Sequence, residues 1–173
     1  IVESTQKRAV ELVKNNGGRV EGETLYVKVQ KAKAPRLEVW DDYGSPTERV
    51  ALTDGRWVWK GKWNEQPGGR GNMVSRLADQ KDAEVTLSFQ GTGAIVVGSY
   101  LTNGGKLDSY VDGKLDRTLD VYSDEPNARQ NEVVWHQFGL KDGAHTVRLV
   151  VRGETYPGSS GTAVAITDAI LFR

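Results

Sequence analysis

Apolar and polar residues alternate in short runs through most of the chain, and tight-turn signals separate the runs. Residues 83–89 place an apolar side chain at every second position, and residues 146–152 and 163–172 are further apolar runs rich in β-branched residues. Because the side chains of a strand point alternately to opposite faces, this period predicts strands with one buried face.

Glycine-containing turns lie between these runs, at Asn103-Gly104-Gly105, Asp112-Gly113 and Lys141-Asp142-Gly143. Asp112-Gly113 predicts a two-residue hairpin, because both central residues of such a turn must tolerate a positive φ. Strands joined by hairpins every 8–12 residues or so are typical of an all-β sandwich or barrel. We expect residues 91–152 to form the centre of a sandwich that the rest of the chain completes.

The first 35 residues follow a different pattern. Apolar residues repeat at helical spacing over residues 1–16 and glycines follow, so a helix is expected there. Residues 24–30 alternate as a strand, and residues 31–35 resemble a linker. This unit is too small to fold alone. We therefore predict two parts: residues 1–35 as an appendage or the tail of an upstream domain, and residues 36–173 as the sandwich.

Tryptophans and glycines complete the expected framework. Short strands are predicted at residues 37–40 and 50–52, and loops at residues 64–72 and 153–162. Trp57, Trp59 and Trp135 are expected in the core, because tryptophan buries a large area.

Composition excludes several classes of partner. Lys and Arg number 23, as do Asp and Glu, so the net charge of zero provides no general attraction to nucleic acid or to an anionic membrane. The absence of cysteine excludes disulfides and thiolate metal sites. No apolar run approaches the roughly 20 residues needed to span a bilayer. We expect neither a nucleic-acid nor a membrane partner, and a monomer.

The segments GTGAIVVGSY, LDSYVDGKL, VVWHQFGLKDGAHTVRLVV and AITDAILF resemble the galactose-binding-like jelly rolls, over residues 47–173 or so. This family includes many carbohydrate-binding modules attached to glycoside hydrolases and esterases. The resemblance implies an all-β jelly-roll sandwich that acts as a non-catalytic module, keeping a tethered enzyme at its polysaccharide. It also implies an extracellular or periplasmic location, with the targeting segment outside this chain, which begins at Ile1.

The helix–strand unit before residue 31 resembles the last part of an ADP-ribosylglycohydrolase-type catalytic domain, which would make the partner an upstream enzyme in the same polypeptide.

Sugar sites combine an aromatic platform for the apolar face of a pyranose with amide and carboxylate groups for its hydroxyls. The predicted loops carry this mixture. The expected ligand-binding residues are Trp63, Tyr100, Asn103, Asp108, Tyr122, Asn127, Arg129 and Tyr156. The alternative is that these are ordinary polar loops.

The resemblance also implies a structural calcium ion held by a carboxylate in the final strand, where this chain has Thr167-Asp168-Ala169-Ile170. Calcium takes six to eight oxygen ligands, so Glu48 or Asp54 is the expected partner of Asp168. The acidic N-terminal motif of the family is not clearly present in this chain. The alternative is that Asp168 hydrogen-bonds to a loop backbone.

Patterns for catalysis are weak. The two histidines, His136 and His145, accompany no cysteine and no Gly-x-Ser-x-Gly motif. The carboxylate pairs are adjacent in sequence, whereas glycoside hydrolysis needs two carboxyls facing each other across a cleft. We therefore expect no enzymatic activity. Two alternatives stay open: a structural or protein-interaction sandwich that buttresses an upstream hydrolase domain, and an independent small hydrolase.

Overall fold

The chain divides into two compact units, Ile1–Glu38 and Val39–Arg173. The computed structural model describes residues 10, 11, 13–15, 19–21, 24–26, 45–67, 74–125 and 129–173. In the first unit, residues 10, 11 and 13–15 are helical, and β1 (Arg19–Glu21) pairs antiparallel with β2 (Thr24–Tyr26). The predicted helix and strand are thus present where they are described, and β1 is an addition. The expected boundary after residue 35 lies outside the described residues.

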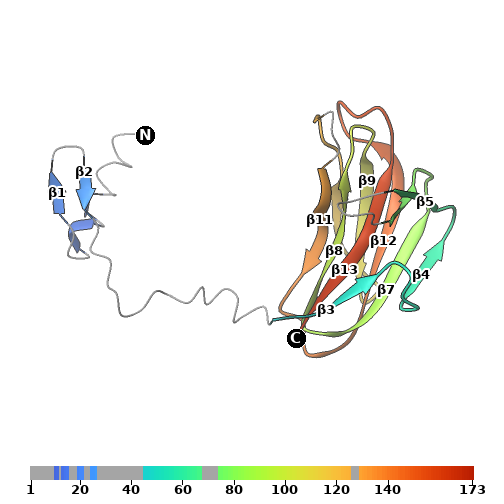
Figure 1. Cartoon of the computed structure of the whole chain (residues 1–173), viewed down its shortest axis with the longest axis horizontal. Coiled ribbons are helices and arrows are strands. Elements are labelled where there is room, and N and C mark those ends of the chain that lie inside the picture. The colour runs from blue at the N-terminus through green and yellow to red at the C-terminus, as the bar shows by residue number, and fades with distance from the viewer. Residues whose placement is uncertain are drawn as a thin grey trace. The chain divides into compact units, whose positions relative to one another are not determined.

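Two antiparallel sheets make up the second unit (Figure 1). One has the strand order β10 (Lys114–Asp120), β9 (Gly105–Val111), β12 (Gly143–Thr155), β7 (Glu84–Gly91) and β4 (Trp57–Lys60). The other has the order β11 (Arg129–Gln137), β8 (Gly93–Tyr100), β13 (Val164–Phe172), β6 (Val74–Ala78) and β5 (Asn64–Pro67), with β3 (Pro46–Ala51) paired to β13. The predicted all-β sandwich is confirmed.

The core lies between the two sheets and follows the alternation in the sequence. On β7, Val85, Leu87 and Phe89 are buried, whereas the residues between them face outward. Trp135 on β11 is 1% exposed, and its indole Nε1 donates to Asp116 Oδ2 at 3.0 Å. The predicted core position of Trp135 is therefore confirmed, and the buried N–H has the partner that burial requires.

The Asp112-Gly113 turn has the predicted geometry. Val111 and Lys114 are paired across it, and φ is 49° at Asp112 and 78° at Gly113. Positive φ at both central residues is typical of a type I′ turn, whose twist matches the strands that it joins.

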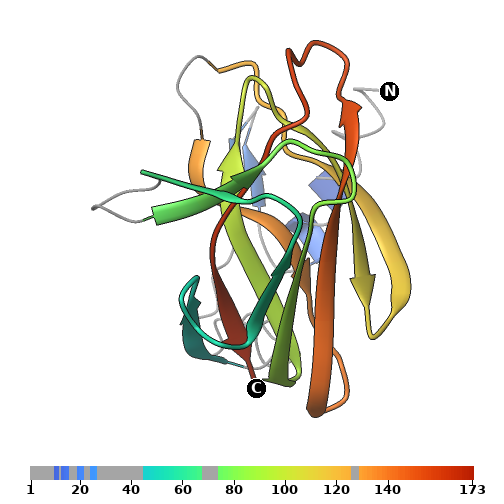
Figure 2. The same ribbon diagram turned by 90° about the vertical axis from the view of Figure 1, so that its right-hand side faces the viewer.

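The long strand β12 connects the two ends of the sandwich. It begins beside the residue 141–143 turn, next to the residue 112–113 turn; these two turns are named here the hairpin end. It finishes at the loop end, which comprises residues 101–104, 121–125 and 156–163. Figure 2 shows the loop after β12 at the opposite end of the sandwich from the C-terminus.

The structure corrects the two loop predictions for residues 64–72 and 153–162, and it places Arg129, also expected in a loop, in a strand. Residues 64–67 form β5, which pairs with β6. Strand β11 begins at Arg129, and β12 continues to Thr155. The residues of β5 are polar and show no apolar alternation, so their sequence did not predict a strand. Backbone hydrogen bonds hold this strand at the edge of its sheet. The strand expected at residues 37–40 lies outside the described residues. Within the described part of the chain, no helix is long and apolar enough to cross a membrane.

Candidate functional site

Two tyrosines form an aromatic platform at the loop end. Tyr122 follows β10 and Tyr156 follows β12, and their rings stack with centroids 5.4 Å apart and planes inclined by 19°. Tyr122 is half-buried, while Tyr156 is 39% exposed. The pair therefore presents a flat, supported aromatic surface, which can pack against the apolar face of a sugar ring while the hydroxyls stay wet.

The loop that carries Tyr156 is tied to its neighbours by hydrogen bonds. Ser160 N donates to Thr102 O at 3.3 Å, and Ala163 N donates to Asn103 O at 2.9 Å. Thr162 Oγ1 donates to the carbonyl of Asp79 at 2.6 Å. Because these contacts order the loop before any ligand arrives, little conformational entropy remains to be lost on binding.

Glycines let the segments of the loop end approach each other closely. A Cβ placed on Gly105 would lie 2.5 Å from Thr162 Cα. Gly158 has φ of 94°, and a Cβ there would lie 3.2 Å from Tyr122 Oη. Glycine is thus required both for the positive φ beneath the platform and for the contact between β9 and the loop.

Three of the expected ligand-binding residues meet at the loop end. Asn103 is exposed, and it contacts the Tyr156 loop through its carbonyl and near Gly161. Tyr122 and Tyr156 form the platform. Tyr100, at the end of β8, packs on the core, and its hydroxyl donates to Val133 O at 3.3 Å. It therefore contributes to the support of β11.

The other expected residues lie elsewhere. Asp108 was expected in a loop, but it lies within β9, where it accepts hydrogen bonds from Thr118 Oγ1 at 2.6 Å and Arg152 Nη1 at 3.1 Å. The loop prediction for Asp108 was wrong because β9 begins directly at Gly105, the last residue of the Asn103-Gly104-Gly105 turn. Asn127 and the side chain of Arg129 lie outside the described residues.

Trp63 has a structural environment beside β4. Its Nε1 donates to the carbonyls of Lys60 and Glu84, each at 3.2 Å. Its ring meets Trp59 edge-on, with centroids 5.0 Å apart. With its polar atom engaged by the backbone, Trp63 is part of the tryptophan cluster packed against the core.

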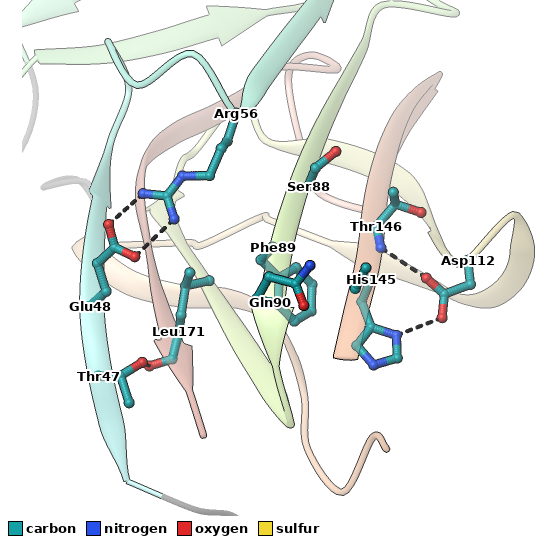
Figure 3. A pocket seen from close by; sticks show the side chains of 11 residues that line it. Thr47, Glu48, Arg56, Ser88, Phe89, Gln90, Asp112, His145, Thr146 and Leu171 are labelled. Carbon is teal, nitrogen blue, oxygen red and sulfur yellow. Dashed lines mark hydrogen bonds and ion pairs between the residues drawn. The ribbon is translucent and has the colours of Figure 1, made fainter. Parts of the chain in front are cut away.

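A second feature is an open pocket of about 450 Å³ where β3 faces β7 and β12 (Figure 3). Its lining residues are Thr47, Glu48, Arg56, Ser88, Phe89, Gln90, Asp112, Ala144, His145, Thr146 and Leu171. In Figure 3, the pair of Glu48 and Arg56 stands on one side and Asp112 with His145 on the other. Sequence reasoning missed this pocket, although Asp54-Gly55-Arg56 and the Asp112 turn both signalled polar groups at turns.

One wall of the pocket carries Glu48 and Arg56, which form a charged triad with Asp54, a residue outside the lining. Arg56 Nη1 donates to Glu48 Oε2 at 2.8 Å, and Arg56 Nε donates to Asp54 Oδ1 at 2.9 Å. The hydrogen bonds from Arg56 lower the pKa of Glu48 and bring the pKa of Asp54 to about 2. The same bonds raise the pKa of Arg56. All three groups therefore stay charged at neutral pH.

On the opposite wall, His145 links Asp112 to the carbonyl of Lys141, an arrangement named here the histidine clamp. His145 Nδ1 lies 2.8 Å from Asp112 Oδ2, and His145 Nε2 lies 2.7 Å from Lys141 O. Both ring nitrogens face acceptors, which only the imidazolium satisfies with two N–H donors. The carbonyl of Lys141 and then the carboxylate of Asp112 raise the pKa of His145. The hydrogen bond from His145 in turn lowers the pKa of Asp112.

Asp168, the expected calcium ligand, is 2% exposed and lies on β13. Its Oδ2 accepts from Arg49 Nε at 2.5 Å, while its Oδ1 and the nearby Thr167 Oγ1 are buried without a hydrogen-bond partner among the described residues. Thr167 and Asp168 line a pocket of about 350 Å³, together with Arg49, Ala51, Leu52, Thr53 and Val74.

The described residues of that pocket do not fit calcium. They supply one carboxylate, against the six to eight oxygens that calcium takes, and a guanidinium already lies on it. Glu48, the expected second ligand, lines the other pocket and binds Arg56 instead. Among the described residues, no cluster of three His, Cys, Asp or Glu side chains could hold a metal ion.

Two curated proteins of Flavonifractor plautii match part of the chain. The "A type blood alpha-D-galactosamine galactosaminidase" is 29% identical over 104 residues, which is 60% of this chain and 9% of that protein. The "A type blood N-acetyl-alpha-D-galactosamine deacetylase" is 33% identical over 98 residues, which is 56% of this chain and 12% of that protein. The chain therefore spans about a tenth of the length of these relatives.

Among solved structures, a two-domain esterase active on acetylated mannans has a similar fold, with a TM-score of 0.58 and 15% identity. The match covers 84% of this chain and 40% of the esterase chain. No protein-family model matches the chain. These matches do not support the expected resemblance to an ADP-ribosylglycohydrolase-type domain.

Proposed function

We propose that the chain is a non-catalytic glycan-binding module that holds a linked glycan-acting enzyme at its substrate. The observation that carries this proposal is the Tyr122–Tyr156 platform, exposed on loops that are already ordered. A module of this kind acts by raising the effective concentration of the enzyme near the glycan.

The comparisons support the class of ligand that we propose. Both relatives are named for amino sugars of the galactose series, and this chain matches only a short segment of each. We therefore take glycans that end in galactosamine or N-acetylgalactosamine as the ligands, and an extracellular or periplasmic location as the setting where such glycans are met. An upstream catalytic domain is the proposed partner within the same polypeptide.

The charged groups of the structure favour binding over catalysis. His145 has an acceptor on each ring nitrogen, and Glu48 and Asp54 are both engaged by Arg56. A general base needs a nitrogen or carboxylate oxygen that is within reach of a substrate proton and titrates near the working pH. Arg56 keeps the pKa values of Glu48 and Asp54 low, and both ring nitrogens of His145 already face acceptors, so these groups are poorly placed to act as a general base.

A glycan array followed by calorimetry tests the proposal. The variant Tyr156→Ala should weaken binding to a glycan found on the array by about tenfold, or about 1.4 kcal/mol, through loss of the stacking surface. Tyr110→Ala is the matched control, because Tyr110 lies on a sheet face beneath Arg148. Equal binding by Tyr156→Ala and the unmodified chain would contradict the platform.

The second candidate is a structural module that buttresses a neighbouring domain. Val58 and Leu115 are 61% and 62% exposed on β4 and β10, the two outer strands of the five-stranded sheet. Such side chains suit a protein contact. Failure of the purified chain to bind any glycan on the array would favour this candidate.

A further inference from the structure

We propose that the pocket between β3 and β7 is a second sugar site, selective for sugars that carry a free amine. It lies at the hairpin end, far from the tyrosine platform. Tyr156 follows His145 by eleven positions along β12 and the residue after it, and a strand rises about 3.3 Å per residue, giving a separation of about 30 Å or more. One sugar residue cannot occupy both places, so the pocket can bind whether or not the platform does.

The pocket and its supporting residues carry an excess of negative charge. Glu48 and Asp54 share the single cation Arg56, and Asp112 faces His145. With the imidazole protonated, the lining itself is balanced, with Glu48 and Asp112 against Arg56 and His145. Asp54, which bonds to Arg56 from outside the lining, adds a third carboxylate against the same two cations. This imbalance attracts an ammonium group and repels a carboxylate or sulfate.

The carboxylates are fixed before a ligand arrives. Asp112 receives hydrogen bonds from Thr146 N at 2.8 Å and from His145, and the fork of Arg56 holds Glu48. Each carboxylate has about four acceptor positions, so acceptor capacity remains for an amine. A charge-assisted hydrogen bond to a pre-ordered carboxylate needs no reorganisation of the site.

The remaining lining suits a sugar ring. Ser88 and Gln90 are exposed polar side chains that can meet hydroxyls, while Phe89 and Leu171 are buried lining residues at the boundary with the core. Figure 3 shows Gln90 between the two charged walls. The volume of about 450 Å³ lies in the range of small-ligand pockets, about 300–1,000 Å³.

The test is an amide NMR titration of the whole chain at about pH 6, below the usual range of an amine pKa. The probes are galactosamine, N-acetylgalactosamine and galacturonic acid, which are cationic, neutral and anionic. We expect galactosamine to bind most tightly and to shift the amides of Ser88, Gln90 and Ala144, and galacturonic acid to bind least.

Two variants remove one charge each while keeping shape, Glu48→Gln and Asp112→Asn. Each should weaken galactosamine binding at these amides about fivefold or more, since a charged hydrogen-bond partner is lost, and should leave N-acetylgalactosamine unchanged. Glu154→Gln is the matched control, because Glu154 lies at the far end of β12 and pairs with Arg152. Thermal unfolding shows whether each variant folds. If one of the two does not, the binding of galactosamine by the other variant tests the site.

Equal affinity for the three probes, or galactosamine shifts confined to the loop end, would overturn the second site. The test of the proposed function at the tyrosine platform is independent of this result. Tyr156→Ala removes the platform but should leave the shifts at Ser88, Gln90 and Ala144 intact.

Discussion

The imidazole of His145 joins the two turns of the hairpin end, because one nitrogen faces Asp112 and the other faces Lys141 O. Asp142 lies near enough to raise the pKa of His145 further, and the Phe89 ring packs 5.7 Å away, centroid to centroid. Neutral histidine satisfies only one of the two acceptors. The clamp therefore depends on the protonation of a single residue.

Thermal unfolding should show this dependence on pH. The folded-state pKa of His145 is raised above the unfolded value of about 6.5, so its stabilisation is complete below about pH 6.5 and is lost as the pH rises through the folded pKa. The pKa of Asp112 is lowered, so its contribution is lost only as the pH falls below about 4. The variant His145→Gln should flatten the loss of stability above pH 6.5. An identical slope in the variant would exclude the clamp.

Asp168 is a buried carboxylate whose charge is met by Arg49. The variant Arg49→Met should destabilise the sandwich by about 2 kcal/mol, because it leaves the buried charge of Asp168 without a partner. The loss of stability is smaller than for a fully buried pair, because Arg49 is about half exposed. Denaturant unfolding measures the difference. Arg173→Met is the control: Arg173 pairs with Asp142 at the surface, so the expected change is within about 0.5 kcal/mol.

Calcium gives an independent check on the same residue. With Arg49 in place, neither added calcium nor a chelator should change the unfolding temperature of the unmodified chain. A rise in that temperature with calcium would show that the ligand set extends beyond the described residues.

The loop end acts as one element, because β9, the residue 121–125 segment and the Tyr156 loop contact each other through backbone. The variant Gly105→Ala would force a Cβ against Thr162, so it should cost about 1–3 kcal/mol of stability through overpacking and weaken glycan binding. Gly55→Ala is the control, since a Cβ at Gly55 has no neighbour within 4 Å. If Gly105→Ala bound glycan as the unmodified chain does, the loops would not need this close packing.

The sequence predicted the strands with a strong apolar pattern, whether one face is buried, as in β7, or both, as in β13. Strands β7, β12 and β13 follow from their apolar runs, and the Asp112-Gly113 hairpin follows from its need for positive φ. Strand β5 has no such signal, because a polar edge strand depends on backbone pairing alone. For the site, aromatic and amide residues in loops pointed to Asn103, Tyr122 and Tyr156, which the structure brings together at the loop end, and their role in binding stays a prediction. The pocket at the hairpin end is formed by residues that are distant in sequence, so no local sequence pattern predicts it.

For the molecule as a whole, the division into Ile1–Glu38 and Val39–Arg173 predicts that the sandwich folds independently. Deletion of residues 1–38 should leave its unfolding temperature and its glycan affinity unchanged, because, among the described residues, the core cluster consists of residues from Val50 onward. Calorimetry on both forms measures this. Loss of cooperative unfolding in the shorter form would show that the first unit stabilises the sandwich.

Strand β13 is the last of the described strands, yet it lies inside its sheet, bonded to β8 on one side and to β3 and β6 on the other. During synthesis, the flanking strands β3, β6 and β8 leave the ribosome before β13. Their edges that pair with β13 therefore stay unpaired until β13 is made. Such edges are templates for pairing with other chains. A product terminated before residue 164 would keep them open permanently, so early termination should yield aggregates rather than a smaller folded domain.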